Sequence, residues 1–215
     1  MNLNVTKDRD KYIGASDLPT ILGYNKSYGT TIIQFAKEKL KLVKPTFSGN
    51  QYTRYGQLME PLIRKFINES FGFNFVEDTI VDEERKLRGN CDGIDREKGK
   101  LLEIKTFSNK LKVDYYTPQC QMYMELFDIN ECWLVGYDRP SDFYSGVDYS
   151  LEKDDSFFNT EFDDSRICIY KLLRNKQQWN KIECEIDKFK YLLECLKEEA
   201  ILNDRGDKND SCNDR

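Results

Sequence analysis

The sequence contains no histidine among its 215 residues. This absence excludes catalytic triads that use a histidine base, and it excludes metal sites that need imidazole ligands. Acid–base or metal chemistry in this chain must therefore use carboxylates, lysine, tyrosine or main-chain oxygen atoms. Oxygen ligands of this kind suit the hard cations Mg²⁺ and Mn²⁺.

Paired cysteine motifs and long apolar runs are also missing. The seven cysteines include no CxxC pair, so the sequence offers no motif for a zinc ribbon or an iron–sulfur cluster. No apolar run reaches the roughly 18 residues of a membrane-spanning helix, and the N-terminus is polar. We therefore expect a cytoplasmic protein whose thiols are reduced and mostly buried.

An excess of positive charge is lacking too, since the formal net charge is −5. This balance argues against a protein that coats nucleic acid with its whole surface, although one local basic groove remains compatible with it. Hydrophobic residues make up 39% of the chain, which is enough for a core. We expect one domain over residues 1–203, with 138–165 as an acidic insertion or loop and 204–215 as a disordered tail.

Hydrophobic spacing predicts an α/β protein of modest size. The expected elements are a short helix within 13–24 that is capped by Ser16 or Asp17, helices at 30–42, 54–71 and 176–201, a helix that begins at Thr117 and Pro118, and strands at 74–82, 86–94, 100–107, 131–137 and 166–172. Pro61 interrupts the 54–71 pattern, so we expect that helix to kink there or to begin near Glu60.

The stretch GNCDGIDREKGKLLEIKT at 89–106 contains the candidate site. Glu103 and Lys105 share one face of their strand because side chains alternate along a strand, and a hairpin can bring Asp92 alongside them. Two carboxylates and the main-chain carbonyl of Ile104 would provide oxygen ligands for Mg²⁺, with Lys105 placed to hold or polarise a water molecule. Charged pairs at strand edges are common, but a lysine within LLEIKTF is hard to explain as decoration facing solvent.

Five blocks in order give the chain a family resemblance. It resembles the phage lambda exonuclease and YqaJ-like recombinase branch of the PD-(D/E)xK nucleases. The blocks are RDKYIGASD (9–17), GQLMEP (56–61), GNCDG (89–93), LEIKT (102–106) and YYTPQCQMYM (115–124). The resemblance implies a restriction-endonuclease-like α/β core, in which helices flank a central mixed β-sheet.

The resemblance also implies roles for individual residues. Asp92 and Glu103 match the metal-binding carboxylates, Lys105 matches the catalytic lysine, and Glu60 matches a glutamate on a helix that joins the metal shell. Gln119 matches a glutamine that steadies the attacking water, and Gln121 fits that role less well. Ser16 and Arg9 match groups that bind the 5′-phosphate of a DNA end. The alternatives are a surface position for Glu60 and Arg9, an N-cap role for Ser16 and a purely helical role for Gln119.

The activity that follows from this resemblance is a Mg²⁺-dependent exonuclease, with Mn²⁺ able to substitute. It would digest linear double-stranded DNA from 5′ to 3′ and leave 3′ single-stranded tails for phage-type recombination. Expected partners are DNA ends, a single-strand annealing protein and further copies in a ring, where Lys37, Lys39, Lys41 and Lys44 would face a shared channel. The expected location is the cytoplasm of a bacterial host, with the gene carried by a phage or prophage.

Two other interpretations remain open from the sequence. One is a structure-specific DNA endonuclease with the same metal site, and the other is a catalytically inactive DNA-binding or adaptor protein that keeps the fold. The chain also departs from the family pattern, because Cys91 precedes Asp92 where the superfamily name implies proline, and because 138–165 matches no part of that pattern.

Overall fold

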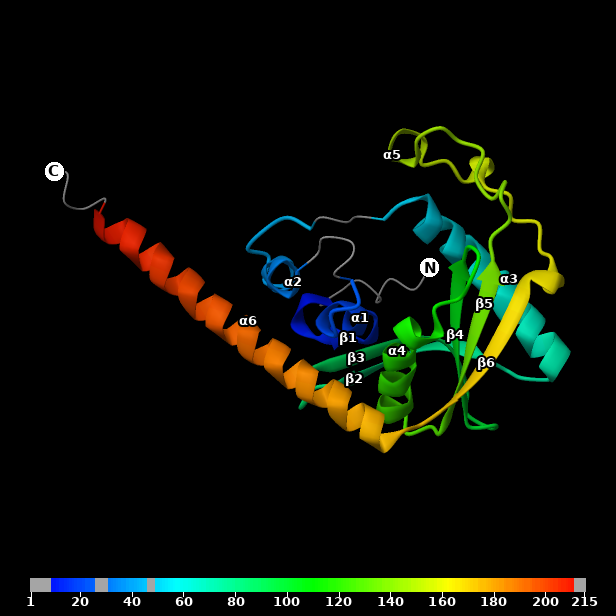
Figure 1. Ribbon diagram of the computed structural model, residues 1–215, viewed down its shortest axis with the longest axis horizontal. Helices are drawn as coiled ribbons and strands as arrows, with labels where there is room; N and C mark the ends of the chain where they lie inside the picture. The colour runs from blue at the N-terminus through cyan, green and yellow to red at the C-terminus, as the bar shows by residue number, and fades with distance from the viewer. Residues whose placement is uncertain (1–8, 26–30, 46–48, 211–215) are drawn as a thin grey trace.

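The computed structural model describes residues 9–25, 31–45 and 49–210, with only the backbone described at Arg9 and at 204–210. Figure 1 shows the arrangement of the elements. The helices are α1 Leu18–Ile21, α2 Ile32–Lys39, α3 Gln51–Phe71, α4 Val113–Leu126, α5 Tyr149–Glu152 and α6 Lys176–Asp210. The strands are β1 Ile13–Gly14, β2 Val76–Asp82, β3 Leu87–Asp95, β4 Lys100–Phe107, β5 Glu131–Asp138 and β6 Ile167–Leu173.

The strands form one mixed sheet, as the family resemblance implied. Its order is β1-β3-β4-β5-β6, and β2 also pairs with β3. The pairs β1–β3 and β4–β5 are parallel, whereas β2–β3, β3–β4 and β5–β6 are antiparallel. The two parallel connections require crossovers, and α4 supplies the crossover between β4 and β5.

Strand β3 has three partner strands, one along one of its edges and two along the other. Strand β2 pairs with β3 from Ile94 to Leu87 and so occupies one edge, with a register shift opposite Asp92 and Gly93. On the other edge, β4 pairs only with residues 93–95 and β1 only with residues 87–88. Residues 89–92 therefore have no strand partner on that edge, and β3 and β4 separate there. We call this opening the fork.

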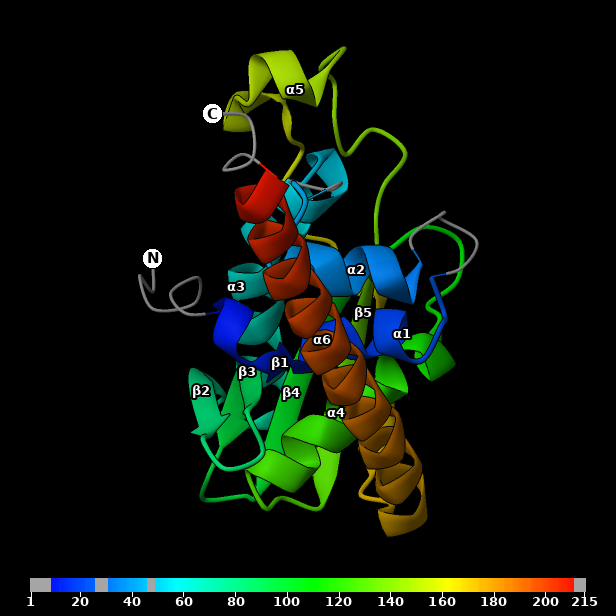
Figure 2. The same cartoon turned by 90° about the vertical axis from the view of Figure 1, so that its left-hand side faces the viewer.

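Two layers of helices cover the two faces of the sheet. Helix α3 packs on one face, where Met59, Ile63 and Ile67 are buried against residues of β4 and β5. Helices α1, α2, α4 and α6 bury apolar side chains in a second cluster on the opposite face. Figures 1 and 2 show the sheet between these layers. Alternation along β4 explains the division, because Leu101 belongs to the second cluster and Leu102 to the first.

Helix α6 runs across α1, α2 and α4 and then extends beyond the sheet (Figures 1 and 2). Its buried stripe contains Trp179, Ile182, Ile186, Phe189 and Leu196, whose spacing follows the helical period. No helix in the described part of the chain is long and apolar enough to cross a membrane.

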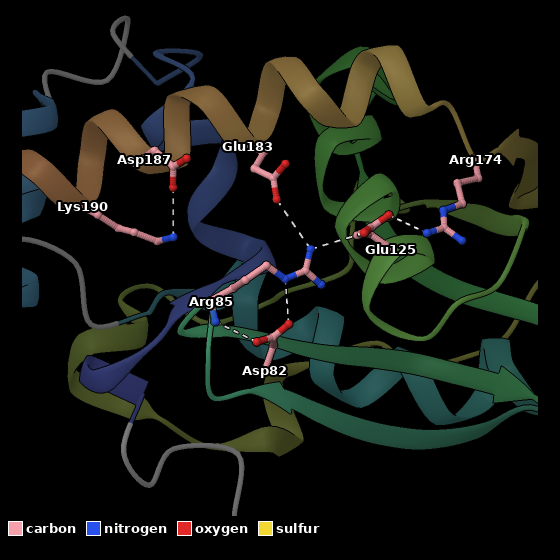
Figure 3. Close-up of polar contacts among 7 residues, drawn as sticks. All are labelled: Asp82, Arg85, Glu125, Arg174, Glu183, Asp187 and Lys190. Carbon is pink, nitrogen blue, oxygen red and sulfur yellow. Dashed lines mark hydrogen bonds and ion pairs between the residues drawn. The ribbon is translucent and has the colours of Figure 1, made fainter.

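Charged groups also join α6 to the body of the protein (Figure 3). Arg85, in the turn between β2 and β3, donates from Nε to Asp82 Oδ2 at 2.7 Å. Its Nη1 forms ion pairs with Glu125 of α4 at 3.3 Å and with Glu183 of α6 at 3.6 Å. Arg174, just before α6, also pairs with Glu125. This cluster connects three segments that are far apart in the sequence.

Several expected element boundaries were wrong. Helix α4 begins at Val113 rather than at Thr117, whose hydroxyl donates to the Val113 carbonyl at 2.9 Å. Pro118 lies inside the helix, past its first turn, although a proline there removes one helical hydrogen bond. Helix α3 runs through Pro61 without ending, from its cap at Asn50. Helix α6 continues to Asp210, so residues 204–210 of the expected disordered tail are helical, and residues 211–215 lie outside the description.

The acidic segment 138–165 contains α5 and short 3₁₀ turns instead of a featureless loop. Tyr144 and Phe158 form an isolated antiparallel bridge, and their rings lie 4.9 Å apart. Phe143 contacts Tyr52 and Tyr55 of α3, with ring centroids 5.3 and 5.2 Å away. The segment is therefore attached to the N-terminal end of α3 by aromatic packing.

Candidate active site

The fork brings Asp92 and Glu103 together. The β3–β4 ladder pairs Gly93 with Leu102, so the next pair in register would be Asp92 and Glu103, but the ladder stops before it. The Asp92 carboxylate instead accepts a hydrogen bond from the main-chain N–H of Ile104, with 2.7 Å between Oδ2 and N. A side chain thus takes the place of a strand partner and is fixed beside the next strand.

Glu103 lies deepest in the fork and is 1% exposed. Its Oε1 accepts from Gln119 Nε2 of α4 at 2.6 Å, and the same Nε2 lies 2.7 Å from the Tyr123 hydroxyl. Tyr123 donates to the Asn90 carbonyl of β3 at 2.7 Å. Two side chains of α4, Gln119 and Tyr123, therefore hold Glu103 in place through hydrogen bonds. The other carboxylate atom, Oε2, is buried and has no hydrogen-bond partner.

Lys105 lies on the same face of β4 as Glu103, as alternation predicted. Its ammonium forms an ion pair with Glu103 Oε1. It also lies 5.5 Å from the centre of the Tyr116 ring, a distance at which a cation is attracted to the face of a ring. The Lys105 side chain is 26% exposed, so the ammonium reaches from the buried carboxylate to the surface of the fork.

Glu60 enters the site from α3, on the opposite side from α4. Arg64, one turn later, pairs with Glu60 at 3.1 Å, donates to the main-chain carbonyl of Asp92 and also pairs with Glu77 of β2. The sequence analysis did not include Arg64. The available signal was its position four residues after Glu60, where the two side chains share one face of a helix.

Burial raises the pKa of all three carboxyl groups. It raises the pKa of Glu103 to about 8, with a further contribution from Asp92, and the pKa of Glu60 to about 7, again with Asp92 contributing. The pKa of Asp92 is raised by burial as well. Burial opposes the charge of Lys105, but Glu103 and Asp92 outweigh it and raise the pKa of that ammonium. The site is thus rich in negative charge that little solvent screens.

These features fit a divalent cation. The buried, unpartnered Glu103 Oε2 and the raised pKa values mark carboxylates that a cation would stabilise. Among the described residues, however, no group of three or more carboxylate or cysteine side chains is arranged to hold a metal ion. A cation here would need main-chain, water or substrate oxygen atoms in addition, as Mg²⁺ commonly does.

Of the two expected phosphate-binding residues, only Ser16 has a described side chain. Ser16 is exposed in the 3₁₀ turn Ala15–Asp17, which packs against α4. The side chain of Arg9 lies outside the described part of the chain. Helix α1 has only four residues, so its N-terminus adds little support for a phosphate site at Ser16.

Two further expectations from the sequence meet contrary geometry. Asp17 does not cap α1 with its side chain; it accepts from Gly14 N at 2.9 Å and pairs with Lys39 at 2.7 Å, both side chains being 8% exposed. Lys39 therefore cannot face a channel, and Lys41 is paired with Asp10. Gln121 joins β6 to α6 by binding the Leu173 carbonyl and the Asn175 N–H, which leaves Gln119 as the glutamine of the fork.

Comparison with known proteins decides the family. The sequence from residue 6 to residue 129 matches the YqaJ-like viral recombinase domain, a match that includes the whole fork and covers more than half of the chain. The chain belongs to this family. No curated protein sequence is significantly similar to this YqaJ-like chain.

Solved structures share the YqaJ-like fold over nearly the full length. A phage-related exonuclease from Haemophilus somnus 129PT superposes with a TM-score of 0.67 at 20% identity, covering 88% of this chain and 96% of that one. The alkaline exonuclease LHK-Exo from Laribacter hongkongensis gives a TM-score of 0.64 at 18% identity, covering 93% and 95%. LHK-Exo in complex with dAMP gives 0.65 at 19%, covering 92% and 94%. At these identities the likeness concerns the fold.

Proposed function

We propose that this YqaJ-like protein is a Mg²⁺-dependent deoxyribonuclease that digests linear double-stranded DNA from its ends. The observation that carries the proposal is the fork, where Asp92, Glu103 and Lys105 meet around a buried carboxylate oxygen that has no partner. The similarity in fold to proteins described as exonucleases supports the exonuclease form of the reaction.

The cation would be held by Asp92, Glu103 and the Ile104 carbonyl, with Glu60 joining directly or through water. It would supply positive charge at the phosphodiester, which is a poor electrophile because it is itself an anion. Mn²⁺ would substitute, since it accepts the same oxygen ligands.

The chain's own residues would position the water and the strand. The Lys105 ammonium, kept charged by Glu103 and Asp92, would hold the attacking water by a hydrogen bond. Attack of the water oxygen on phosphorus breaks the bond to the leaving oxygen, which takes up a proton. Gln119 holds Glu103 in its rotamer through the 2.6 Å hydrogen bond, so the proposed ligand geometry depends on α4.

The direction of digestion belongs to the same proposal. Ser16 and Arg9 would bind the 5′-phosphate of the DNA end, so that the enzyme proceeds from 5′ to 3′ and leaves a 3′ tail. A single-strand annealing protein would receive that tail, and further copies of the chain in a ring would keep the enzyme on DNA. Family membership supports these points.

One assay tests the proposal directly. A linear duplex with 5′-phosphates and a label on one strand is incubated beside a covalently closed circle, with either Mg²⁺ or EDTA. We expect the linear duplex to lose its 5′-phosphorylated strand only with Mg²⁺, and the circle to stay intact. Nicking of the circle would instead indicate an endonuclease.

Variants connect the assay to the fork. Glu103→Ala and Lys105→Ala should abolish Mg²⁺-dependent digestion and leave DNA binding largely intact. Arg96→Gln is a suitable control, because Arg96 is 68% exposed at the closed end of the β3–β4 hairpin. Digestion by Glu103→Ala at the wild-type rate would show that the fork is not the catalytic centre, and binding without any digestion by wild-type protein would indicate an adaptor.

A further inference from the structure

Arg139 is held next to the candidate active site by the end of the sheet. Lys105 pairs with Gly136 in the β4–β5 ladder, and the ladder ends at Phe107 and Asp138. The Arg139 N–H continues it by donating to the Phe107 carbonyl at 2.8 Å. The side chain folds back, and its Nη1 donates to the Thr106 carbonyl at 2.9 Å and to Thr106 Oγ1 at 3.2 Å. The guanidinium thus lies against the residue that follows Lys105.

This guanidinium forms no ion pair with a carboxylate of the described part of the chain, although Asp138 interacts with it at longer range. Ion pairs bind six other arginines to carboxylates, namely Arg54, Arg64, Arg85, Arg96, Arg166 and Arg174. Arg139 instead contacts neutral oxygens, and its Nε is buried without a hydrogen-bond partner. Burial of a cation without a counter-ion is unfavourable. A fixed guanidinium without an ion-pair partner is therefore suited to an incoming anion.

Aromatic rings fix the plane of the guanidinium. Its central carbon lies 4.8 Å from the centre of the Tyr52 ring and 5.6 Å from that of Phe143. Tyr52 is 45% exposed, and the outer nitrogen Nη2 donates to Ser108 Oγ at 3.1 Å in an exposed contact. The inner edge of the group is therefore anchored, while its outer edge and Tyr52 face solvent.

A row of residues on α3 connects this position to the fork. Tyr52, Gly56, Glu60 and Arg64 recur every four residues, so each lies next to the following one in a row that is inclined to the helix axis. Arg64 contacts Asp92 at one end of this row, and Tyr52 contacts Arg139 at the other. Between them, a Cβ added at Gly56 would lie 3.5 Å from Thr106 Oγ1, so the helix passes close to β4 there. A strand that follows this row would pass from the carboxylates to the guanidinium.

We propose that Arg139, with Tyr52 and Ser108, binds a backbone phosphate of the DNA strand next to the phosphodiester that is cleaved. The inference rests on the proposed nuclease function and adds a binding residue to it. The carboxylates of the fork repel a polyanion, and Lys105 and Arg64 are already engaged with Glu103 and Glu60. Arg139 supplies a cation that remains available to the strand.

Salt dependence of binding tests this contact. Binding of a 5′-phosphorylated duplex is measured over a range of KCl in the Glu103→Ala protein with Mg²⁺, where the DNA remains uncut. Arg139→Gln should weaken binding about tenfold and reduce the slope of log K against log [salt] by roughly one, the loss of one phosphate contact. Arg139→Lys should keep the slope but recover only part of the affinity, because it cannot bind in a bidentate way.

Controls separate the contact from folding and from the nuclease proposal. Arg96→Gln removes the same charge at the closed end of the β3–β4 hairpin, outside the proposed contact, and should leave the slope unchanged. Unchanged slope and affinity in Arg139→Gln, together with unchanged KM in the otherwise wild-type enzyme, would overturn the phosphate contact and leave the nuclease intact. A reduced slope in a protein that shows no Mg²⁺-dependent digestion would support the contact and overturn the nuclease. If Arg139→Gln does not fold, Arg139→Lys with wild-type affinity would count against the contact.

Discussion

At the scale of single residues, the burial of Glu103 favours cation binding but destabilises the carboxylate when no cation is bound. Asp92 increases the conflict, since the two carboxylates repel each other. Sites that bind metals or perform chemistry often carry such a cost to stability.

A prediction for the metal-free protein follows from this conflict. The folded-state pKa of Glu103, about 8, lies above its ordinary value of 4.5, so its contribution to stability declines as the pH rises between these values. At pH 9 in EDTA, Glu103→Gln should therefore melt several degrees above wild type, although it is inactive. At pH 4.5 the difference should vanish. Glu69→Gln, at a position 68% exposed, serves as the control and should not change the melting temperature.

The same pKa values predict how Mg²⁺ binding depends on pH. Cation binding requires ionised carboxylates, so it must release the protons that Glu103 and Glu60 hold below about 8 and about 7. The rise in melting temperature that Mg²⁺ produces should be larger at pH 8.5 than at pH 6. An equal rise at both pH values would contradict the assignment of these carboxylates as ligands.

The sequence alone predicted some residues of this site and missed others. Asp92, Glu103 and Lys105 could be placed together because strand alternation and a hairpin determine their positions. Arg64 and Arg139 could not, because their contacts depend on how α3 and β5 pack against β4. Local spacing also does not reveal that the β3–β4 ladder ends at Gly93 and Leu102, one residue before Asp92.

At the scale of elements, the fork depends on the strand pair that precedes it. Gly93 forms the last rung with Leu102, and an added Cβ would lie 2.7 Å from Phe75 Cβ and 3.1 Å from Leu102 Cβ. Such short contacts would force β3 and β4 apart at Gly93. Asp92 is the next residue along β3, so its carboxylate would shift with the strand. The geometry of the carboxylates is therefore coupled to the absence of a side chain at 93.

Two glycine substitutions should have opposite effects. Gly93→Ala should lower the free energy of unfolding by about 1–3 kcal/mol through overpacking and should reduce digestion. Gly56→Ala, in the interior of α3, should raise it by up to about 1 kcal/mol, because no atom would lie closer than 3.5 Å to the new Cβ and alanine favours a helix. Urea unfolding of both variants measures the difference, and a stable Gly93→Ala would contradict the packing described for β3.

Helix boundaries illustrate what local signals miss at this scale. Thr117 and Pro118 form a common helix start, yet α4 begins one turn earlier. There Val113 and Tyr116 pack against the apolar cluster on the face of the sheet opposite α3. Pro61 likewise fails to end α3, which is held by a row of buried side chains on both sides of it. Tertiary packing outweighed the local preference in both helices.

At the scale of the whole molecule, α6 connects the first helices of the chain to the sheet. Phe189 is fully buried and stacks on Phe35 of α2, with centroids 5.5 Å apart, and Arg85 binds Glu183 nearer the start of α6. The layer around Ser16 is thus held partly by residues from the far end of the sequence.

A pair of substitutions two residues apart tests this attachment. Phe189→Ala should lower the free energy of unfolding by about 3–5 kcal/mol, because it leaves a cavity between α6 and α2. Tyr191→Ala should change it by less than about 0.5 kcal/mol, since Tyr191 is 69% exposed. Thermal or urea unfolding gives both values, and equal losses in the two variants would contradict the orientation of α6.

The parallel β4–β5 pair has a consequence for where the chain can be divided. The region that matches the family ends at residue 129, yet β5, the neighbour of the strand that carries Glu103 and Lys105, begins at Glu131. A chain shortened to the matched region would leave β4 with an open edge and expose apolar residues that β5 now covers. Residue 129 is thus the end of the sequence match and not the end of the folded unit, which includes β5, β6 and the part of α6 that packs on the body of the protein.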